Sequence, residues 1–153
     1  MKLQKATLCG LYAVLELAAH SDKQLSAGEI AAKYGISLNH LAKVLRALVR
    51  ARLVESVRGA SGGYRFSGNP KRVTLLNVIE LFEDIPSEDR KGPSSGPSEK
   101  RALDSVFHEI DEITVATLRS VSLTTLLNRT QKQQRSSQIE PERGGRVKAA
   151  AGE

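Results

Sequence analysis

The feature that most constrains this fold is a short interval between two helical patterns, centred on Gly35. Ser26 and Glu29 stand three residues apart, which is the spacing of a capping box that begins a helix. Gly35 suits the left-handed conformation that ends this helix, and Ser37 can cap the next helix only two residues later. Because so short a link forces the two helices to cross steeply, the pattern predicts a helix-turn-helix.

Apolar residues on both sides of the turn fit such a crossing. Ala31 is small enough for the helices to approach closely, and larger side chains can fill the angle between them: Ile30, Ile36, Leu41 and Val44. A first amphipathic helix, over about residues 4–20, is predicted from a spacing of three and four in Leu8, Leu11, Tyr12, Leu15, Ala18 and Ala19. A helix-turn-helix often binds DNA, but small helical hairpins with a glycine turn are also common. On these residues alone, a helical hairpin without a DNA-binding role stays open as the alternative.

The helix that follows, from Ser37 to about Arg52, divides into an apolar and a polar face. Its apolar face holds Leu38, Leu41, Leu45, Leu48 and Val49. Its polar face holds Asn39, Lys43, Arg46 and Arg50. In a helix-turn-helix the N-terminal part of the second helix enters the major groove of DNA.

The residues predicted to contact base edges are therefore Ser37, Asn39, His40 and Lys43, since Asn can pair with adenine and Lys with the acceptors of guanine. Arg46 and Arg50 lie one and two turns further on, and we assign both to flanking phosphates or solvent. For each of these residues the alternative is an ordinary solvated helix face. For Arg50 and Arg52 a solvated helix face explains the positive charge as well as a contact with DNA does.

A β-hairpin is predicted directly after this helix, with strands over residues 53–57 and 64–66. Its loop reads Arg58-Gly59-Ala60-Ser61-Gly62-Gly63, and the three glycines permit positive φ and leave backbone amides uncovered. The hairpin is most simply a wing whose Arg58 enters the minor groove, while the loop lies along the DNA backbone through Gly59, Ser61, Gly62 and Gly63. The loop lacks the Gly-Lys-Ser/Thr ending of a nucleotide-binding P-loop, which excludes that site.

These motifs resemble the Rrf-two family of bacterial winged-helix transcription regulators, of the IscR and NsrR type. The resemblance rests on the Met-Lys-Leu start, Tyr12-Ala13, Ile36-Ser37-Leu38, Leu53-Val54 and, most specifically, Val57-Arg58-Gly59-Ala60-Ser61-Gly62-Gly63-Tyr64. It covers residues 1–86 well and residues 99–128 in outline. It implies a mainly α fold with a small β-hairpin, in which a winged helix-turn-helix is followed by a C-terminal dimerisation helix. It also implies a homodimeric repressor or activator that reads an inverted repeat in double-stranded DNA, and of these we expect a repressor.

The family pattern continues through Thr74, which caps a helix containing Leu75, Val78, Ile79 and Phe82 that Pro86 ends. In the family a later helix crosses to the partner subunit, and here its apolar stripe is Leu103, Val106, Phe107, Ile110 and Ile113. The same seam is expected to continue through Leu118, Val121, Leu123, Leu126 and Leu127. Packing within one chain is the alternative, but a helix tethered by a flexible loop has little of its own domain to cover it.

One departure from the family concerns its sensor. The best-known members hold an iron–sulfur cluster with three closely spaced cysteines before the dimerisation helix, whereas residues 86–98 contain none. Cys9, the one cysteine of the chain, is expected to be a small buried apolar residue, so we predict no cluster and no cofactor. His108, Glu109, Asp111 and Glu112 lack a metal-ligand spacing, and no nucleophile–base set stands out, so we expect neither a metal site nor an enzyme.

The net charge of +6 favours a polyanionic partner, and its distribution agrees with the motif. Residues 1–86 hold 12 Lys and Arg against 7 Asp and Glu, whereas residues 87–130 hold 6 against 7. We expect a DNA-binding domain over residues 1–86, a flexible loop over 87–98, a dimerisation helix region over 99–128 and a disordered tail over 129–153. No apolar run reaches the ~20 residues that span a bilayer, and no signal peptide is recognisable, so we expect a cytoplasmic protein.

Two other functions stay open at this point. A winged helix can bind an acidic protein partner instead of DNA, and a regulator of this kind can sense a metal or a redox change. No effector is predicted.

Overall fold

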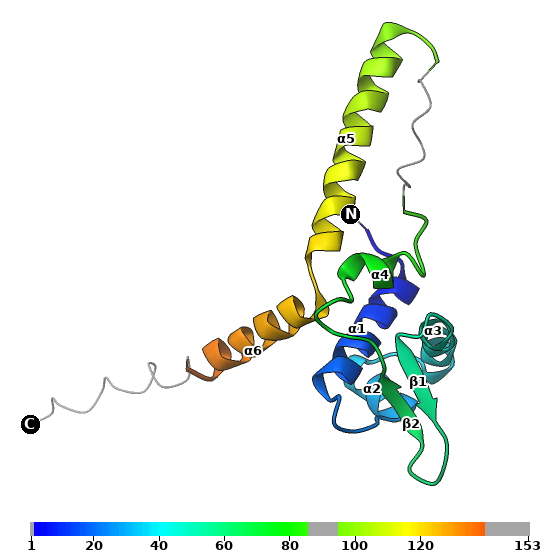
Figure 1. The fold of residues 1–153 in the computed structure, drawn as a ribbon, viewed down its shortest axis with the longest axis vertical. Helices are drawn as coiled ribbons and strands as arrows, with labels where there is room; N and C mark the ends of the chain where they lie inside the picture. The colour runs from blue at the N-terminus through cyan, green and yellow to red at the C-terminus, as the bar shows by residue number, and fades with distance from the viewer. Residues whose placement is uncertain (1, 86–94, 140–153) are drawn as a thin grey trace, which may run out of the picture.

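The computed structural model describes residues 2–85 and 95–139 (Figure 1). Its elements in chain order are α1 (Lys5–Ala19), α2 (Ala27–Tyr34), α3 (Leu38–Arg50), β1 (Val54–Val57), β2 (Gly63–Phe66), α4 (Leu75–Ile79), α5 (Ser98–Ser120) and α6 (Leu123–Ile139). The first six elements form one body, from which α5 and α6 project in different directions (Figure 1). The predicted class, mainly α with a small antiparallel hairpin, is confirmed.

Helix α1 is the centre of this body. It contacts α2, α3, α4, α6 and β2, and α3 packs its buried leucines against it. The bounds of α1 agree with the prediction, but its buried face does not follow the predicted stripe. Leu8 and Tyr12 are exposed, whereas Ala13, Val14 and Leu17 are fully buried. The difference arises because elements cover α1 from several sides, so its burial exceeds a single amphipathic stripe.

The turn of the helix-turn-helix is built as its residues predict. The Ser26 hydroxyl accepts a hydrogen bond from the Glu29 amide at 3.1 Å, and the Glu29 carboxylate accepts one from the Ser26 amide at 2.7 Å. Gly35 ends α2 with φ of +61°, and the next amide, of Ile36, donates to the carbonyl of Ala31 at 2.9 Å. Ser37 occupies the N-cap position of α3, but among the described residues its hydroxyl makes no capping hydrogen bond.

A buried carboxylate ties α1 to α2. Glu16 accepts hydrogen bonds from the Lys33 ammonium at 2.6 Å and from the Tyr34 hydroxyl at 2.7 Å, and the His20 ring lies 3.4 Å away. Burial raises the pKa of Glu16. The hydrogen bonds from Lys33 and Tyr34 and the nearby positive charges lower the pKa, and together they outweigh the effect of burial, so the net shift is downward. The Tyr34 ring also stacks on Tyr12, with centroids 4.9 Å apart. These contacts fix the orientation of α2, and through it the angle at which α3 leaves the turn.

Helix α4 is shorter than predicted. Thr74 and Asn77 form a capping box at its start, as the Thr74 position suggests. The helix then ends at Ile79 in a turn, well before Pro86, which lies outside the described residues. After this turn Glu83 binds the start of α1, accepting hydrogen bonds from the Gln4 amide at 2.7 Å and the Thr7 hydroxyl at 2.5 Å.

The region over residues 99–128, expected as a dimerisation helix region, holds α5 and the start of α6, because the chain breaks between Ser120 and Leu123. There the Leu75 amide donates to the carbonyl of Val121, and the Leu123 amide donates to the carbonyl of Val73, both at 2.9 Å. Leu123 is fully buried in the core of its own domain, and Leu118 and Leu127 pack against that core. Leu123 is therefore enclosed within its own chain and is not exposed along the seam that the family resemblance implied.

The predicted disordered tail also needs correction. Residues 129–139 belong to α6, a helix that extends away from the body on the side opposite α3 (Figure 1). The low apolar content beyond Leu127 suggested disorder, but the buried Leu123 anchors the first turn, and a helix once begun propagates at small cost. Residues 140–153 and most of the predicted loop over 87–98 lie outside the described residues.

Truncation of Leu123 tests whether α6 belongs to the core. We expect Leu123→Ala to lower the free energy of unfolding by about 2–5 kcal/mol, because it leaves a cavity among fully buried side chains. Urea unfolding at fixed protein concentration measures this loss, with the half-buried Leu126→Ala as a milder control. A variant that kept its stability but changed its oligomeric state would restore Leu123 to the dimer seam.

The Glu16 cluster predicts a specific pH dependence. Because the folded-state pKa of Glu16 lies below its ordinary value of 4.5, its contribution is present above that pH and is lost as the pH falls through the folded-state pKa. Glu16→Gln should therefore cost about 1–2 kcal/mol at pH 7, and the difference from wild type should shrink towards pH 3. Urea unfolding across this range measures it. Glu55→Gln, which alters the exposed pair with Arg65, should have a smaller effect, and a difference independent of pH would contradict the assignment.

Candidate nucleic-acid interface

The exposed face of α3 carries most of the residues predicted to read DNA. Asn39, Lys43 and Arg46 are exposed along it, and Ser37 is exposed at its N-cap. The opposite face is buried through Leu41, Val44, Leu45 and Leu48. The structure therefore presents these polar side chains together on a rigid element, with the helix held from behind by the core.

Two residues at the start of α3 differ from their predicted positions. His40 is half-buried, and its Nε2 is enclosed without a hydrogen-bond partner among the described residues. Leu38, which the spacing placed on the apolar face, is 54% exposed beside Ser37 and Asn39. An exposed leucine in this place can contact the methyl group of thymine. The spacing of apolar residues alone does not resolve this difference.

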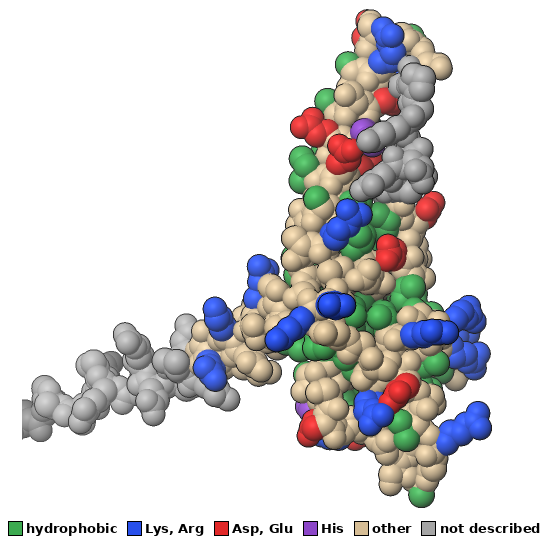
Figure 2. Space-filling model, in the orientation of Figure 1, with side chains coloured by type: hydrophobic (Ala, Val, Ile, Leu, Met, Phe, Trp, Pro, Cys, Tyr) green, Lys and Arg blue, Asp and Glu red, His purple; other side chains and the backbone are tan. Residues whose placement is uncertain are grey.

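Positive charge gathers over α3 without an acidic residue nearby in the sequence. From Ile30 to Val54 the chain has no Asp or Glu, and Figure 2 shows Lys and Arg side chains along the edge of the molecule where α3 lies. The next carboxylate, of Glu55, is paired with Arg65 across the hairpin. A basic helix face without acidic neighbours is the electrostatic footprint expected of a surface that binds a polyanion.

The wing extends from the end of the body as a two-stranded hairpin. Val54 pairs with Phe66, and Val57 pairs with Gly63, so the loop consists of residues 58–62. Arg58 and Ser61 are exposed in this loop, and Gly59 has φ of +123°. The loop thus carries one exposed cation, and within it the Gly62 amide donates a hydrogen bond to the carbonyl of Gly59 at 2.9 Å.

Two glycines of the wing also have a structural task. A β-carbon on Gly62 would lie 2.7 Å from the carbonyl oxygen of Val57, and one on Gly63 would lie 2.6 Å from that of Leu25. Gly63 is the point where the wing meets the segment before α2, because Leu25 and Tyr64 exchange backbone hydrogen bonds of 3.0 and 2.8 Å. These glycines would be required for the shape of the wing even without contact with DNA.

The segment before α2 was not recognised as part of this site. Besides the backbone pairing of Leu25, the side chain of Gln24 donates a hydrogen bond to the carbonyl of Ser61 in the wing loop. The wing is therefore anchored to the start of the helix-turn-helix. The sequence signal was weak, because one residue pairing with a strand has no periodicity.

The junction between α3 and β1 contains an unusual backbone conformation. Arg52 has φ of +59°, the one positive value on a non-glycine residue in the described part of the chain. Around it the Leu53 amide donates to the carbonyl of Leu48 at 3.1 Å, and the Arg52 amide donates to that of Val49 at 3.0 Å, which is a Schellman motif. A side chain in this left-handed position costs roughly 1–2 kcal/mol relative to the unstrained conformation, and glycine usually occupies it.

Metal ligands are scarce in the described part of the chain. Residues 2–85 and 95–139 contain no group of three or more His, Cys, Asp or Glu side chains that could hold a metal ion. Cys9 is buried, and this burial raises the pKa of its thiol, which disfavours the thiolate that a cluster needs. His108 instead lies 3.4 Å from Glu112 on α5, as an ordinary pair one turn apart.

The apolar stripe of α5 is uncovered in the single chain. No residue of this helix is buried against the described parts of the chain. Leu103, Val106, Phe107, Ile110 and Ile113 are each 52–60% exposed. A row of five large apolar side chains in contact with water is unusual for an isolated protein.

Among the helices of the described ranges, none is both long and apolar enough to cross a membrane.

Comparison with known proteins agrees with this architecture. The family model Rrf2, described as an iron-dependent transcriptional regulator, matches residues 3–129. The chain is 59% identical over 152 residues to a Rhodopseudomonas palustris protein described as the HTH-type transcriptional regulator BadM, covering 99% of this chain and 97% of that protein.

Solved structures give the same result. CymR, the global cysteine regulator of B. subtilis, superposes with a TM-score of 0.72 at 26% identity, covering 84% of this chain and 98% of that one. IscR of T. potens superposes with a TM-score of 0.68 at 27% identity, covering 88% and 91%. The chain therefore belongs to the Rrf2 family and is a winged-helix transcriptional regulator, not an enzyme.

Proposed function

We propose that this protein is a homodimeric, cytoplasmic repressor that reads an inverted repeat in double-stranded DNA and works without an iron–sulfur cluster. Membership of a transcriptional regulator family implies DNA binding. The observation that carries the proposal is the exposed, acid-free basic face of α3 beside a glycine-rich wing. Occupation of the operator by a dimer can block other proteins from the same DNA, which is why we favour repression.

The roles within the interface follow from the geometry of a recognition helix. Ser37, Asn39 and Lys43 lie at the exposed N-terminal part of α3 and are proposed to contact base edges. Arg46, further along the same face, is proposed to bind a phosphate. His40 has the weakest support, since its Nε2 is enclosed. Arg58 is proposed to enter the minor groove, with Gly59, Ser61, Gly62 and Gly63 shaping the loop along the backbone.

The dimer is proposed to form through α5. Its 23 residues span about 35 Å, and the five exposed apolar side chains run along one stripe of it. A second copy of the same helix can cover that stripe in a two-fold arrangement, in which each patch is its own complement. A two-fold dimer would place two α3 helices on half-sites about one turn of DNA apart.

The Rrf2 family is described as iron-dependent, so we asked whether this chain has the ligands that an iron–sulfur cluster needs. Iron–sulfur clusters are held by several cysteine thiolates, and this chain has one cysteine, which is buried in α1. The residues present do not fit a cluster, and we propose that this member regulates without one.

Selection of bound sequences from a random duplex pool tests the proposal most directly. A homodimeric reader should enrich an inverted repeat whose half-sites are centred about one helical turn apart. The protein should be purified anaerobically, and a colourless preparation that selects the repeat would support cluster-free binding. Failure to enrich any sequence would contradict the proposed function, and enrichment of a single half-site would contradict the dimer.

Substitution of the two central cations tests the groove assignment. Lys43→Ala should weaken binding to the selected duplex by about 1–3 kcal/mol and relax the preference at one base position. Arg58→Ala should weaken binding to selected and unrelated duplexes more evenly and reduce its salt dependence. Fluorescence anisotropy at several salt concentrations measures both.

Lys132→Ala, a matched loss of charge on the distant α6, serves as the control and should bind as wild type does. Normal binding by both Lys43→Ala and Arg58→Ala would make the groove assignment wrong. DNA binding that scarcely depended on salt would instead favour the alternative of a winged helix that binds an acidic protein partner.

A charge placed in the α5 stripe tests the dimer. Phe107→Asp should convert the dimer to a monomer, because two buried carboxylates would face each other across the two-fold axis. Analytical ultracentrifugation measures the mass, and circular dichroism checks that the helices persist. Glu109→Ala, on the other side of α5, should remain dimeric. A Phe107→Asp dimer as stable as wild type would locate the interface elsewhere.

A further inference from the structure

The left-handed conformation of Arg52 has no explanation within the fold. The Schellman motif is made entirely by backbone groups, so glycine would complete it without the steric cost of a β-carbon. The Arg52 carbonyl accepts a hydrogen bond from the Ser67 hydroxyl at 3.0 Å, and this bond is also independent of the side chain. The guanidinium itself is exposed and contacts no hydrogen-bonding or acidic partner among the described residues. In the free protein, therefore, no contact of the Arg52 side chain with the described residues offsets the strain of its backbone.

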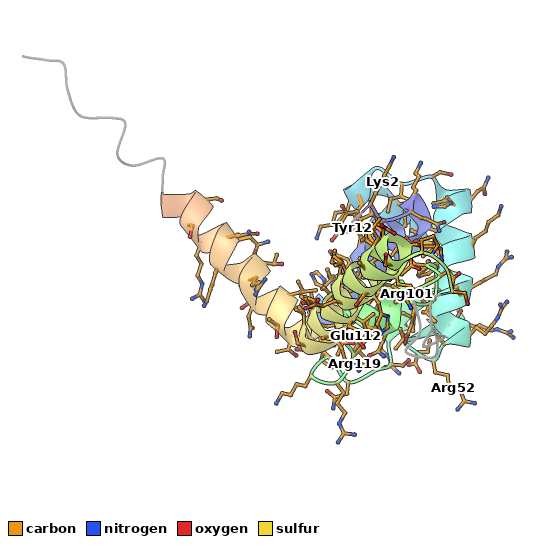
Figure 3. All side chains as sticks on the ribbon, turned by 90° about the horizontal axis from the view of Figure 1, so that it is seen from above. Lys2, Tyr12, Arg52, Arg101, Glu112 and Arg119 are labelled. Carbon is orange, nitrogen blue, oxygen red and sulfur yellow. The ribbon has the colours of Figure 1, made fainter. Side chains whose placement is uncertain are left out.

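The position of Arg52 connects it to the DNA-reading surface. It follows the last turn of α3 and precedes the first wing strand, so both elements that face DNA meet at this residue. Figure 3 shows its side chain pointing outward into solvent, away from the body of the domain. Arg50 lies about 16 Å further along the helix axis than Asn39, and Arg52 comes after it. The major groove is about 12 Å wide. With Asn39 and Lys43 in the groove, the end of α3 therefore reaches the phosphate backbone at its edge.

We propose that Arg52 is a phosphate-binding residue that locks the junction between α3 and the wing onto the DNA backbone. Arg52 lies just beyond the C-terminal end of α3, and its left-handed backbone directs the guanidinium outward there. Arginine binds phosphate through two parallel hydrogen bonds and remains charged at any working pH. Strained residues in folded proteins concentrate at binding sites, where the contact compensates for the strain. This inference rests on the proposed DNA binding and adds a contact that the helix pattern left unassigned.

The proposal predicts opposite effects of one substitution on stability and on binding. Arg52→Gly should raise the melting temperature by about 2–5 °C, because glycine adopts the left-handed conformation freely. The same change should weaken binding to the selected duplex and to a random 30-base-pair duplex by a similar factor, on the order of tenfold for a dimer. The slope of log affinity against log salt should fall by about two, since each protomer loses one phosphate contact.

Three further variants separate charge from backbone. Arg52→Lys keeps the charge and the strain, and should retain most of the affinity while gaining no stability. Arg52→Asn removes the charge but tolerates the left-handed conformation, so it should bind as weakly as Arg52→Gly. Arg129→Ala, an exposed cation on α6, should change neither the salt slope nor the affinity. Differential scanning fluorimetry and anisotropy titrations on the full chain supply the measurements.

The outcomes distinguish this inference from the proposed function. An Arg52→Gly protein that is more stable and binds both duplexes as tightly as wild type would overturn the phosphate contact. An Arg52→Gly protein that is less stable would overturn the claim that Arg52 is strained. A wild-type protein that binds neither duplex would instead refute the DNA-binding proposal itself.

Discussion

The packing of α3 against α1 is the interaction on which the rest of the structure depends. Leu41, Leu45 and Leu48 are fully buried there, and this burial turns the opposite face of α3 outward. The angle of α3 is set at its other end by Gly35, and α2 is held in turn by the Glu16 cluster. A recognition surface must be rigid to read bases, and here a hydrophobic contact, a left-handed glycine and a buried carboxylate provide that rigidity together.

The wing depends on the same body through a less obvious connection. A two-stranded hairpin alone is only marginally stable in water. Here Leu25 pairs with Tyr64 and Gln24 binds the loop, so the segment that enters the helix-turn-helix also supports the hairpin. The two parts of the reading surface are therefore positioned relative to each other by one short segment. A shift of residues 24–26 would move α2 and the wing together.

The apolar residues of α5 and α6 lie in two different environments that the spacing of apolar residues does not separate. The stripe from Leu103 to Ile113 faces water, whereas Leu123 is fully enclosed by its own domain. Both sets are large apolar residues, and the family resemblance implied that they form one seam. The break at Val121 and Ser122 separates the two sets, because backbone hydrogen bonds to residues 70–75 bring the chain back to the core. Such a long-range pairing leaves no periodic signal in the sequence.

Residue types and their spacing were enough to predict the local features of this protein: the capping box at Ser26, the left-handed turn at Gly35, the basic helix after it and the glycine-rich hairpin. These features depend on residues a few positions apart, so their types and spacings suffice to predict them. The packing of the folded chain was needed to show which face of α1 is buried, that the Nε2 of His40 is enclosed while Leu38 is exposed, and that Leu123 belongs to the core. It also revealed that an arginine occupies the left-handed residue after α3. These outcomes depend on contacts between residues far apart in the chain, whose energies no local pattern records.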